Sequence, residues 1–272
     1  MKKDKIPQLS AQFYEINTIF APKKTIDMAF SNNNYTGSPT TPVTLNLIII
    51  NVVMLLADNV LRTKGINLTQ LLGLHYYDAP NYHVWQSFTY MFMHANFTHL
   101  FSNMFSLYMF GRLLEMVWGT QRFLIYYLVC GVGAALVQQL TWRWGMHDAM
   151  AQALMMANPG VPGDQICAMS YSELLNYCEG YVNNYITVGA SGSVFGILLA
   201  FGMMFPNATI FLLFPPMPLK AKWLVIGYGL FELFTGVANT AGDNVAHFAH
   251  LGGMLFGFIL IMLWKHDKRM TF

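Results

Sequence analysis

The sequence predicts an all-α membrane protein whose chain crosses the bilayer six times. Hydrophobic residues make up 55% of its 272 residues and charged residues only 10%, whereas an ordinary soluble domain has about 25% charged residues. The apolar residues also form long unbroken blocks instead of following the period of an amphipathic helix or strand. This composition excludes a nucleic-acid-binding module, a disordered scaffold and a soluble Rossmann-type enzyme.

Six apolar segments are candidates for membrane-spanning helices, because a helix that crosses about 30 Å of hydrocarbon needs roughly 20 residues. They are residues 43–60, 99–118, 122–141, 191–205, 223–238 and 245–264. The fourth segment ends before Pro206, since a proline inside a helix removes a hydrogen bond and clashes with the preceding turn. The stretch 207–218 mixes apolar residues with prolines, and we expect an irregular connection there.

The distribution of Lys and Arg predicts the orientation, because loops rich in these residues stay on the cytoplasmic side. With the N-terminus inside, only three of the 15 basic residues lie outside: Arg62, Lys64 and Arg143. We therefore expect a cytoplasmic N-terminal segment (residues 1–42), a six-helix membrane domain (residues 43–264) and a cytoplasmic tail (residues 265–272).

The N-terminal residues do not read as a cleavable signal peptide, because they lack an apolar core of the needed length before Pro22. We therefore expect the first span to direct insertion. The compact six-span form and the lack of a targeting signal suggest a bacterial inner membrane.

Two of the expected outside loops are long. Residues 61–93 are too polar to cross the bilayer but rich in apolar and aromatic side chains, so we expect them to lie in the membrane interface. Residues 142–187 carry a Pro/Gly cluster together with Cys167 and Cys178. The outside compartment can be oxidising, and the sequence leaves open both a disulfide bridge and two unpaired thiols.

Polar and ionisable side chains inside a bilayer are costly, and each one is therefore a candidate functional group. They occur at the start of the second span, at the start of the fourth, within the fifth and at the start of the sixth. These residues are His94, His99 and Asn103, then Ser191 and Ser193, then Glu232, and finally His247 and His250.

Three of these side chains are predicted to lie at one depth. With the N-terminus inside, the even-numbered spans run from outside to inside, and His99, Ser191 and His250 each lie in the first two turns of an even-numbered span. At about 1.5 Å per residue, all three lie roughly 0 to 10 Å below the outer boundary. Residues distant in sequence are therefore expected on the same side of the membrane.

Small residues recur at every fourth position in the fourth and sixth spans, and such stripes let transmembrane helices approach closely. Ser191 lies one position before the first stripe, and His250 lies one position after the start of the second. Contact between these helices would bring the hydroxyl group towards the imidazole. The stripes are Gly192, Gly196 and Ala200, and Ala249, Gly253 and Gly257.

A serine beside a histidine is the minimum for an activated nucleophile, because the imidazole removes the hydroxyl proton and later returns it to the leaving group. The tetrahedral intermediate also needs donors for its oxyanion. The backbone N–H of Ser191 at a helix start could supply one. His99 and Asn103, spaced i, i+4 on one helix face, could supply two more.

We do not expect a carboxylate to orient His250. Asp243 lies seven residues earlier, in the expected loop, and Glu232 belongs to an odd-numbered span, where we expect it to lie deeper. The sequence therefore predicts a Ser-His dyad and not a triad. Ser193 is expected to have a structural role only.

Taken together, four motifs resemble those of the rhomboid family of intramembrane serine proteases, over about residues 85–257. "HANFTHLFSN" resembles the second-helix motif, "GRLLEMVWGT" the turn that follows it, "GASG" the nucleophile motif and "AHLGGMLFG" the sixth-helix motif. The resemblance implies that Ser191 is the nucleophile, His250 the base, and His99 and Asn103 the oxyanion donors.

The resemblance also implies a six-helix bundle with a water-filled cavity open to the outside, a half-submerged first loop and a fifth helix that admits substrate laterally. The reaction would be hydrolysis of a peptide bond in or near the transmembrane segment of a single-pass membrane protein, with no metal or cofactor and no nucleic acid. The oligomeric state and the physiological substrate stay open. One departure is that the family's first loop often carries Trp-Arg, whereas Trp85 is followed here by Gln86.

Three other functions are less well supported by the residues. An inactive, client-binding relative usually lacks the serine or the histidine, and both Ser191 and His250 are present. A transporter with histidine proton relays predicts internal repeats and charge pairs near the midplane, and the sequence contains neither. A zinc site predicts HExxH-type spacing, which the histidines do not have.

Overall fold

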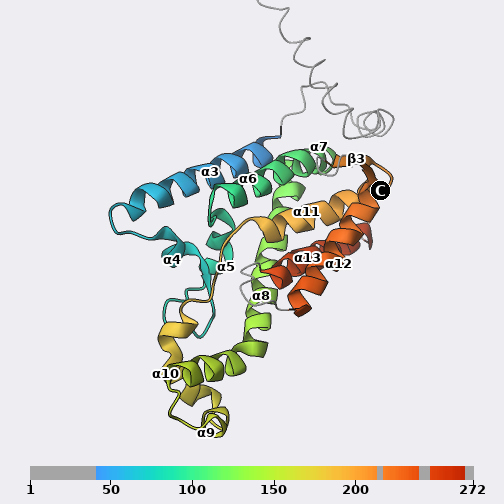
Figure 1. Cartoon of the computed structure of the whole chain (residues 1–272). Coiled ribbons are helices and arrows are strands. Elements are labelled where there is room, and N and C mark those ends of the chain that lie inside the picture. The colour runs from blue at the N-terminus through green and yellow to red at the C-terminus, as the bar shows by residue number, and fades with distance from the viewer. Residues whose placement is uncertain (1–40, 213–216, 239–245, 267–272) are drawn as a thin grey trace, which may run out of the picture.

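The computed structural model describes residues 41–212, 217–238 and 246–266. These residues form a mainly helical fold with two small antiparallel ladders (Figure 1). Most of the expected N-terminal segment and C-terminal tail lie outside the described residues, and so do Asp243 and Val245.

The first long helix, α3 (Pro42–Arg62), covers the expected span 43–60. Pro42 stands in its first turn, where the missing N–H costs nothing because that group has no partner inside the helix. The buried carboxylate of Glu115 accepts hydrogen bonds from the backbone N–H of Val43 at 3.0 Å and of Thr44 at 2.8 Å. A later helix therefore caps the start of α3.

The expected second span is one continuous run of helix from Phe97 to Trp118. It consists of α6 (Phe97–Ser106), the π-helical turn η2 (Leu107–Gly111) and α7 (Arg112–Trp118). Gly119 ends α7 with φ of 81°, a left-handed conformation that glycine adopts without strain. The next helix, α8, starts at the following residue.

Helix α8 (Thr120–Ala157) has 38 residues, which is about 57 Å of helix and far more than a bilayer needs. The expectation that this helix ends near residue 141 and is followed by a loop was wrong. No proline interrupts the chain before Pro159, and the apolar side chains of Met146 and Met150 stay buried beyond the expected end. In Figure 1 the far half of α8 continues past the other long helices.

Two further helices pack around the far end of α8 (Figure 1): α9 (Gly163–Cys167) and α10 (Tyr171–Val182). Together with part of the first loop they enclose a separate small core, which we call the outer lobe. Cys178 is buried there and Cys167 is exposed, and both thiols are free. The buried residues of the outer lobe are Tyr76, Ala79, Met146, Met150, Ala151, Ile166, Leu174, Cys178 and Val182.

The last three long helices are α11 (Ser191–Met204), α12 (Ala221–Ala238) and α13 (His247–His266). Helices α11 and α13 approach each other through glycines, as the small-residue stripes predict. A Cβ atom at Gly253 would lie 1.9 Å from the carbonyl oxygen of Gly192. Only a residue without a side chain fits there, so this contact fixes the first turns of the two helices side by side.

The connection between α11 and α12 is more regular than expected. Strands β3 (Thr209–Leu212) and β4 (Met217–Lys220) pair antiparallel, from Thr209 opposite Lys220 to Leu212 opposite Met217. The apolar and β-branched residues of β3 favour a strand, and Pro218 is tolerated because each strand of a two-stranded sheet is an edge. The prediction of an irregular connection was therefore wrong for the described part.

The first loop is a chain of short elements that lies against the start of α11. It contains α4 (Leu68–Leu72), β1 (Leu74–His75), α5 (Gln86–Thr89) and the 3₁₀ turn η1 (Tyr90–Phe92). Strand β1 pairs antiparallel with β2 (Ile186–Thr187), which lies four residues before Ser191. The loop is thereby tied to the segment that leads into α11.

Gln86, which stands where the rhomboid pattern often has arginine, holds this loop together. Its side chain is fully buried. The amide oxygen accepts hydrogen bonds from the backbone N–H of His75 and His83, at 3.3 and 3.2 Å. The amide nitrogen donates to the carbonyl oxygens of Leu71 and Asn81, at 3.3 and 2.9 Å. A neutral side chain therefore joins four points of the loop.

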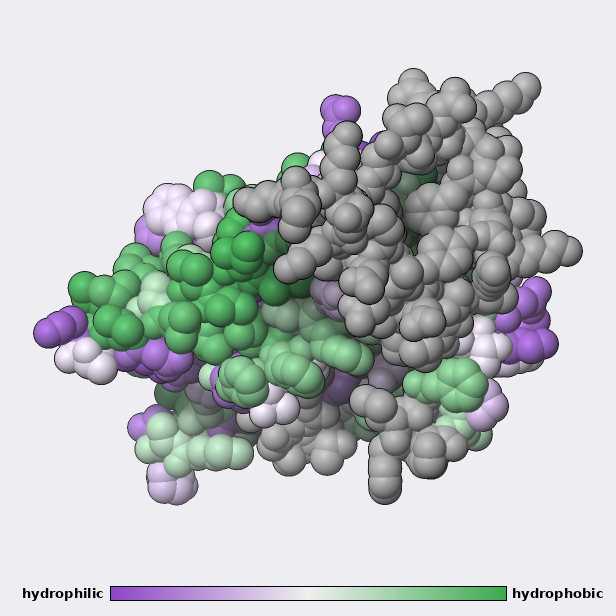
Figure 2. Space-filling view, turned by 90° about the horizontal axis from the view of Figure 1, so that it is seen from above, coloured by the Kyte–Doolittle hydropathy of each residue, from purple (hydrophilic) through white to green (hydrophobic). Residues whose placement is uncertain are grey.

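Four of the described helices are long and apolar enough to cross a membrane: α3, α8, α12 and α13. Large apolar side chains on their surfaces are exposed, among them Ile49 and Leu56 on α3 and Phe234 on α12. Figure 2 shows a broad apolar area on the left, the side on which α3 lies in Figure 1. Such a surface is stable in contact with lipid and not with water.

Candidate active site

The first turns of α11 and α13 bring a serine and a histidine together. The Ser191 hydroxyl oxygen lies 2.8 Å from Nε2 of His250, within hydrogen-bond distance. Ser191 is the first residue of α11, and His250 lies in the first turn of α13. The close contact at Gly253 explains why these two turns are adjacent. The sequence predicts that both residues lie at the same depth, and the structure brings them into contact.

A carboxylate does reach His250, contrary to the expectation from the sequence. Oε2 of Glu232 lies 2.9 Å from Nδ1 of His250. Glu232 is six residues before the end of α12 at Ala238, or about 9 Å from that end. His250 is three residues into α13, about 4.5 Å from its start. The two side chains therefore lie near the adjacent ends of their helices, and the prediction that no carboxylate is placed to orient His250 was wrong.

The same carboxylate oxygen also contacts His247. Nδ1 of His247 lies 2.7 Å from Oε2 of Glu232 and 3.0 Å from the hydroxyl oxygen of Thr235. The three side chains of Glu232, His247 and His250 are all buried. Each offers one ligand atom to a metal ion, and these atoms lie within 4.8 Å of one another. At 2.7 and 2.9 Å, however, the nitrogens bond directly to the carboxylate.

An aromatic ring fixes the plane of the imidazole. Phe195 stacks on His250 with ring centroids 4.3 Å apart and an interplanar angle of 6°. Phe195 is four residues after Ser191, so both side chains lie on the same face of α11. Sequence reasoning missed this residue, although its i, i+4 spacing from the serine was a usable signal.

Gly189 lies between His99 and Ser191, at a position where a side chain would not fit. A Cβ atom at Gly189 would lie 2.8 Å from Nε2 of His99 and 3.5 Å from the hydroxyl oxygen of Ser191. The φ of Gly189 is 130°, which side chains rarely tolerate. The imidazole of His99 and the serine hydroxyl therefore both lie beside Gly189, and the missing side chain allows this close approach.

The start of α6 is held by two neighbours of His99. The side chain of Asn96 accepts a hydrogen bond from the backbone N–H of His99 at 2.8 Å, as an N-cap. The ring of His94, in the connection before α6, packs edge-on against that of His99 at 5.0 Å. Burial, with a smaller contribution from His99, lowers the pKa of His94 to about 3. The His94 ring is therefore neutral at physiological pH.

Asn103 lies one turn beyond His99 on α6 and is 5% exposed. Within the part of the chain that the structure describes, its amide nitrogen has no hydrogen-bond partner. A buried donor without a partner is costly. The amide is thus free to bind an acceptor that enters the site.

Ser193 lies close in sequence to Ser191 but points elsewhere. It is completely buried, and its hydroxyl donates to the carbonyl oxygen of Tyr127 on α8 at 2.7 Å. This hydroxyl already has its partner and joins α11 to α8. It makes Ser193 a suitable control for tests of Ser191.

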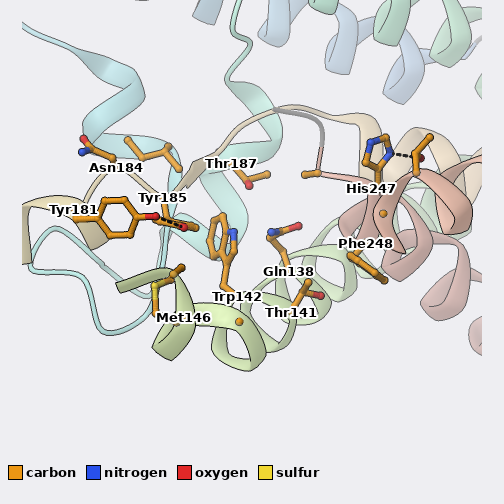
Figure 3. Close-up of a pocket in the computed structure, with 16 residues that line it drawn as sticks. Gln138, Thr141, Trp142, Met146, Tyr181, Asn184, Tyr185, Thr187, His247 and Phe248 are labelled. Carbon is orange, nitrogen blue, oxygen red and sulfur yellow. Dashed lines mark hydrogen bonds between the residues drawn. The ribbon is translucent and has the colours of Figure 1, made fainter. Parts of the chain in front are cut away.

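A cavity of about 630 Å³ lies beside this cluster, between the membrane helices and the outer lobe. In Figure 3, Gln138, Thr141 and Trp142 rise from α8, with Tyr185 on one side and His247 and Phe248 on the other. His247 connects the wall of this cavity to Glu232. The cavity therefore reaches the histidine cluster from the side of the outer lobe.

The apolar helices and this buried cluster define an integral membrane protein that carries a hydrogen-bonded serine, histidine and carboxylate. Residues 81–266 match the rhomboid domain, and the chain belongs to the rhomboid family.

Several known proteins of this family are similar to the chain. Rhomboid-like protein 11, chloroplastic, of Arabidopsis thaliana is 28% identical over 80% of this chain and 63% of its own length. Rhomboid protease AarA of Providencia stuartii is 26% identical over 80% of this chain and 70% of its own. Putative rhomboid protease YdcA of Bacillus subtilis is 25% identical over 68% and 69%, respectively. The chain thus spans less than two thirds of the first of these relatives.

Proposed function

We propose that this protein is an intramembrane serine endopeptidase that hydrolyses peptide bonds in or near the transmembrane segments of single-pass membrane proteins. The observation that supports it most is the 2.8 Å contact between the Ser191 hydroxyl oxygen and Nε2 of His250. Two of the similar proteins carry names that describe them as rhomboid proteases, one of them as putative.

In this proposal Ser191 attacks the carbonyl carbon of the substrate while Nε2 of His250 takes the hydroxyl proton. The tetrahedral intermediate collapses to an acyl-enzyme, and the imidazolium returns the proton to the departing amine. Water then attacks the ester, with His250 again as the base, and releases the acid and the free serine. The 2.8 Å contact suits the transfer of the serine proton to His250, which needs heavy atoms about 2.6 to 3.2 Å apart.

The negative oxygen of the intermediate needs donors aimed at one point. Three groups suit this role. The backbone N–H of Ser191 has no partner inside α11, because it belongs to the first turn. Nε2 of His99 and the Ser191 hydroxyl oxygen both lie within 3.5 Å of the position that a Cβ atom of Gly189 would take. The buried amide nitrogen of Asn103 lies on the same helix face and has no hydrogen-bond partner among the described residues.

We further propose that the chain crosses the membrane six times with both termini on the cytoplasmic side. Besides the four long apolar helices, the run α6–η2–α7 is about 33 Å long, enough for a crossing. The apolar helix α11 has 14 residues and is continued by the β3–β4 hairpin. In this topology Ser191, at the start of α11, lies near the outer surface, and the outer lobe extends from the same side.

The test is cleavage of a labelled transmembrane substrate by purified protein reconstituted in lipid vesicles. We expect Ser191→Ala and His250→Ala each to abolish cleavage, whereas Ser193→Ala retains it because its hydroxyl only bonds to α8. Full activity in Ser191→Ala would overturn the proposal.

A further inference from the structure

We propose that Glu232 is a positioning residue for the reaction: its carboxylate holds His250 in the tautomer whose Nε2 faces Ser191, and His247 holds the carboxylate in place. This inference rests on the proposed function, and it adds a third member to the predicted dyad. Glu232 acts through His250 and does not itself touch the reacting atoms.

The first step is the direction of the hydrogen bond between α12 and α13. An ionised carboxylate only accepts hydrogen bonds, so Nδ1 of His250 donates to Oε2 of Glu232 across their 2.9 Å contact. A neutral imidazole has one N–H. With the proton on Nδ1, Nε2 carries the lone pair and accepts from the Ser191 hydroxyl at 2.8 Å. This is the tautomer that a general base requires.

The second step concerns charge. Glu232 is 4% exposed, and a buried carboxylate is stable only with strong partners. No lysine or arginine among the described residues forms an ion pair with it; its partners are the two imidazoles. When His250 takes the serine proton, an imidazolium forms beside this carboxylate. The negative charge then stabilises the positive one where it develops.

The third step is the role of His247. Its Nδ1 donates to the same oxygen of Glu232 at 2.7 Å. The neighbouring Thr235 hydroxyl donates its own proton to the carbonyl oxygen of Phe231 at 2.7 Å, so the Thr235 oxygen near His247 is an acceptor. The proton on Nδ1 of His247 therefore lies between Glu232 and Thr235. Two residues within one turn of α12 thus contact His247, and His247 holds the carboxylate.

The first experiment compares Glu232→Gln and Glu232→Ala with the unsubstituted protein in the reconstituted cleavage assay. We expect kcat to fall about 10- to 100-fold in Glu232→Gln, whose amide oxygen accepts a bond without the charge. We expect kcat to fall about ten times further in Glu232→Ala, while KM stays within about twofold of the unsubstituted value in both variants. A kcat equal to that of the unsubstituted protein in folded Glu232→Gln would overturn the proposal.

Glu115→Gln is the matched control. Glu115 is also a buried carboxylate, but it caps α3 through Val43 and Thr44. We expect this variant to lower the thermal unfolding temperature without lowering kcat. An equal loss of kcat in both variants would mean that any buried carboxylate of the bundle has this effect, and would overturn a positioning role for Glu232.

The second experiment needs no variant of Glu232 and no activity. Histidine ¹⁵N–¹H spectra of the full chain, with His250→Ala to assign the signal, report which nitrogen carries the proton. We expect a hydrogen-bonded Nδ1–H at His250, and a proton on Nε2 would overturn the inference. If the unsubstituted protein does not cleave the substrate, the proposed function fails while the spectrum still decides the tautomer. If it cleaves and Glu232→Gln cleaves equally well, only this inference fails.

A chelator separates the hydrogen-bonded arrangement from a metal site at the same three side chains. Because the nitrogens of His247 and His250 bond directly to Oε2 of Glu232, we expect EDTA to leave kcat unchanged. Loss of activity on EDTA treatment, restored by adding zinc, would overturn the positioning role.

Discussion

Phe195 lies flat against the imidazole of His250, with ring centroids 4.3 Å apart and an angle of 6° between the rings. The Phe195 ring also makes an edge-to-face contact with Tyr228 of α12, at an interplanar angle of 85°. The stack leaves the imidazole little freedom to rotate about its side-chain bonds. Together with the contact to Glu232, it fixes the direction in which Nε2 points.

Replacing this ring should slow the reaction. An aromatic pair contributes about 0.5 to 1.5 kcal/mol beyond its buried area, so we expect Phe195→Ala to lower kcat about 3- to 10-fold by loosening the imidazole. Phe195→Tyr keeps a flat ring and should retain most of the activity. Steady-state cleavage kinetics test this, and an unchanged kcat in Phe195→Ala would show that the stack has no such role.

Gly189→Ala should block the site. The new methyl group would lie 2.8 Å from the His99 ring, and the φ of 130° is strained for any side chain. We expect the rate of cleavage to fall about 100-fold or more. Gly180→Ala is the control, because nothing lies within 4 Å of a Cβ there. Equal activity of the two variants would contradict the requirement for a glycine beside His99 and Ser191.

Gln86→Ala should loosen the first loop. Four hydrogen bonds to backbone groups disappear. At about 0.5 to 1.5 kcal/mol net for each of the four bonds, we expect the free energy of unfolding to fall by roughly 2 to 6 kcal/mol. Thermal unfolding in detergent measures the loss, with the exposed Gln165→Ala as control. A loss below that of the control would mean that the loop does not depend on Gln86.

We expect the free energy of unfolding to decrease in acid because of His94. Burial lowers its pKa to about 3, so the unfolded chain, with an ordinary value near 6.5, binds more protons between these two pH values. The stability is complete above about pH 6.5 and is lost as the pH falls, by at most about 1.4 kcal/mol for each pH unit. We expect His94→Gln to flatten this dependence between pH 7.5 and 5, and an unchanged slope of unfolding temperature against pH would contradict it.

The pairing of Ser191 with His250 could be predicted from the sequence, because the number of spans and the small-residue stripes place both at the start of adjoining helices. The contact between the Glu232 carboxylate and His250 could not be predicted in this way. The predicted fifth span ends at residue 238, where α12 also ends, but whether the side chain of Glu232 reaches His250 depends on how α12 packs against α13, which the hydrophobicity pattern does not define. A shift of one helical turn along α12, about 5.4 Å, decides whether a side chain is level with His250 or lies below it.

The outer lobe could not be predicted from the hydrophobicity pattern either. Hydrophobicity predicts where a helix leaves lipid, but not where the helix ends. Helix α8 continues because Met146 and Met150 find a second apolar core outside the expected span. Likewise, Gln86 stands where the rhomboid pattern suggests arginine, and its role appears only once four backbone groups of a folded loop surround it.

The most direct test of the central claim is covalent labelling by a fluorophosphonate, which reacts with an activated serine and needs no knowledge of the substrate. We predict that the unsubstituted protein is labelled at Ser191, that His250→Ala is labelled far more slowly, and that Ser193→Ala is labelled at the unsubstituted rate. Mass spectrometry of the labelled peptide locates the modification. Folded protein that takes up no label, or that takes it up equally in Ser191→Ala, would contradict a serine protease at this site.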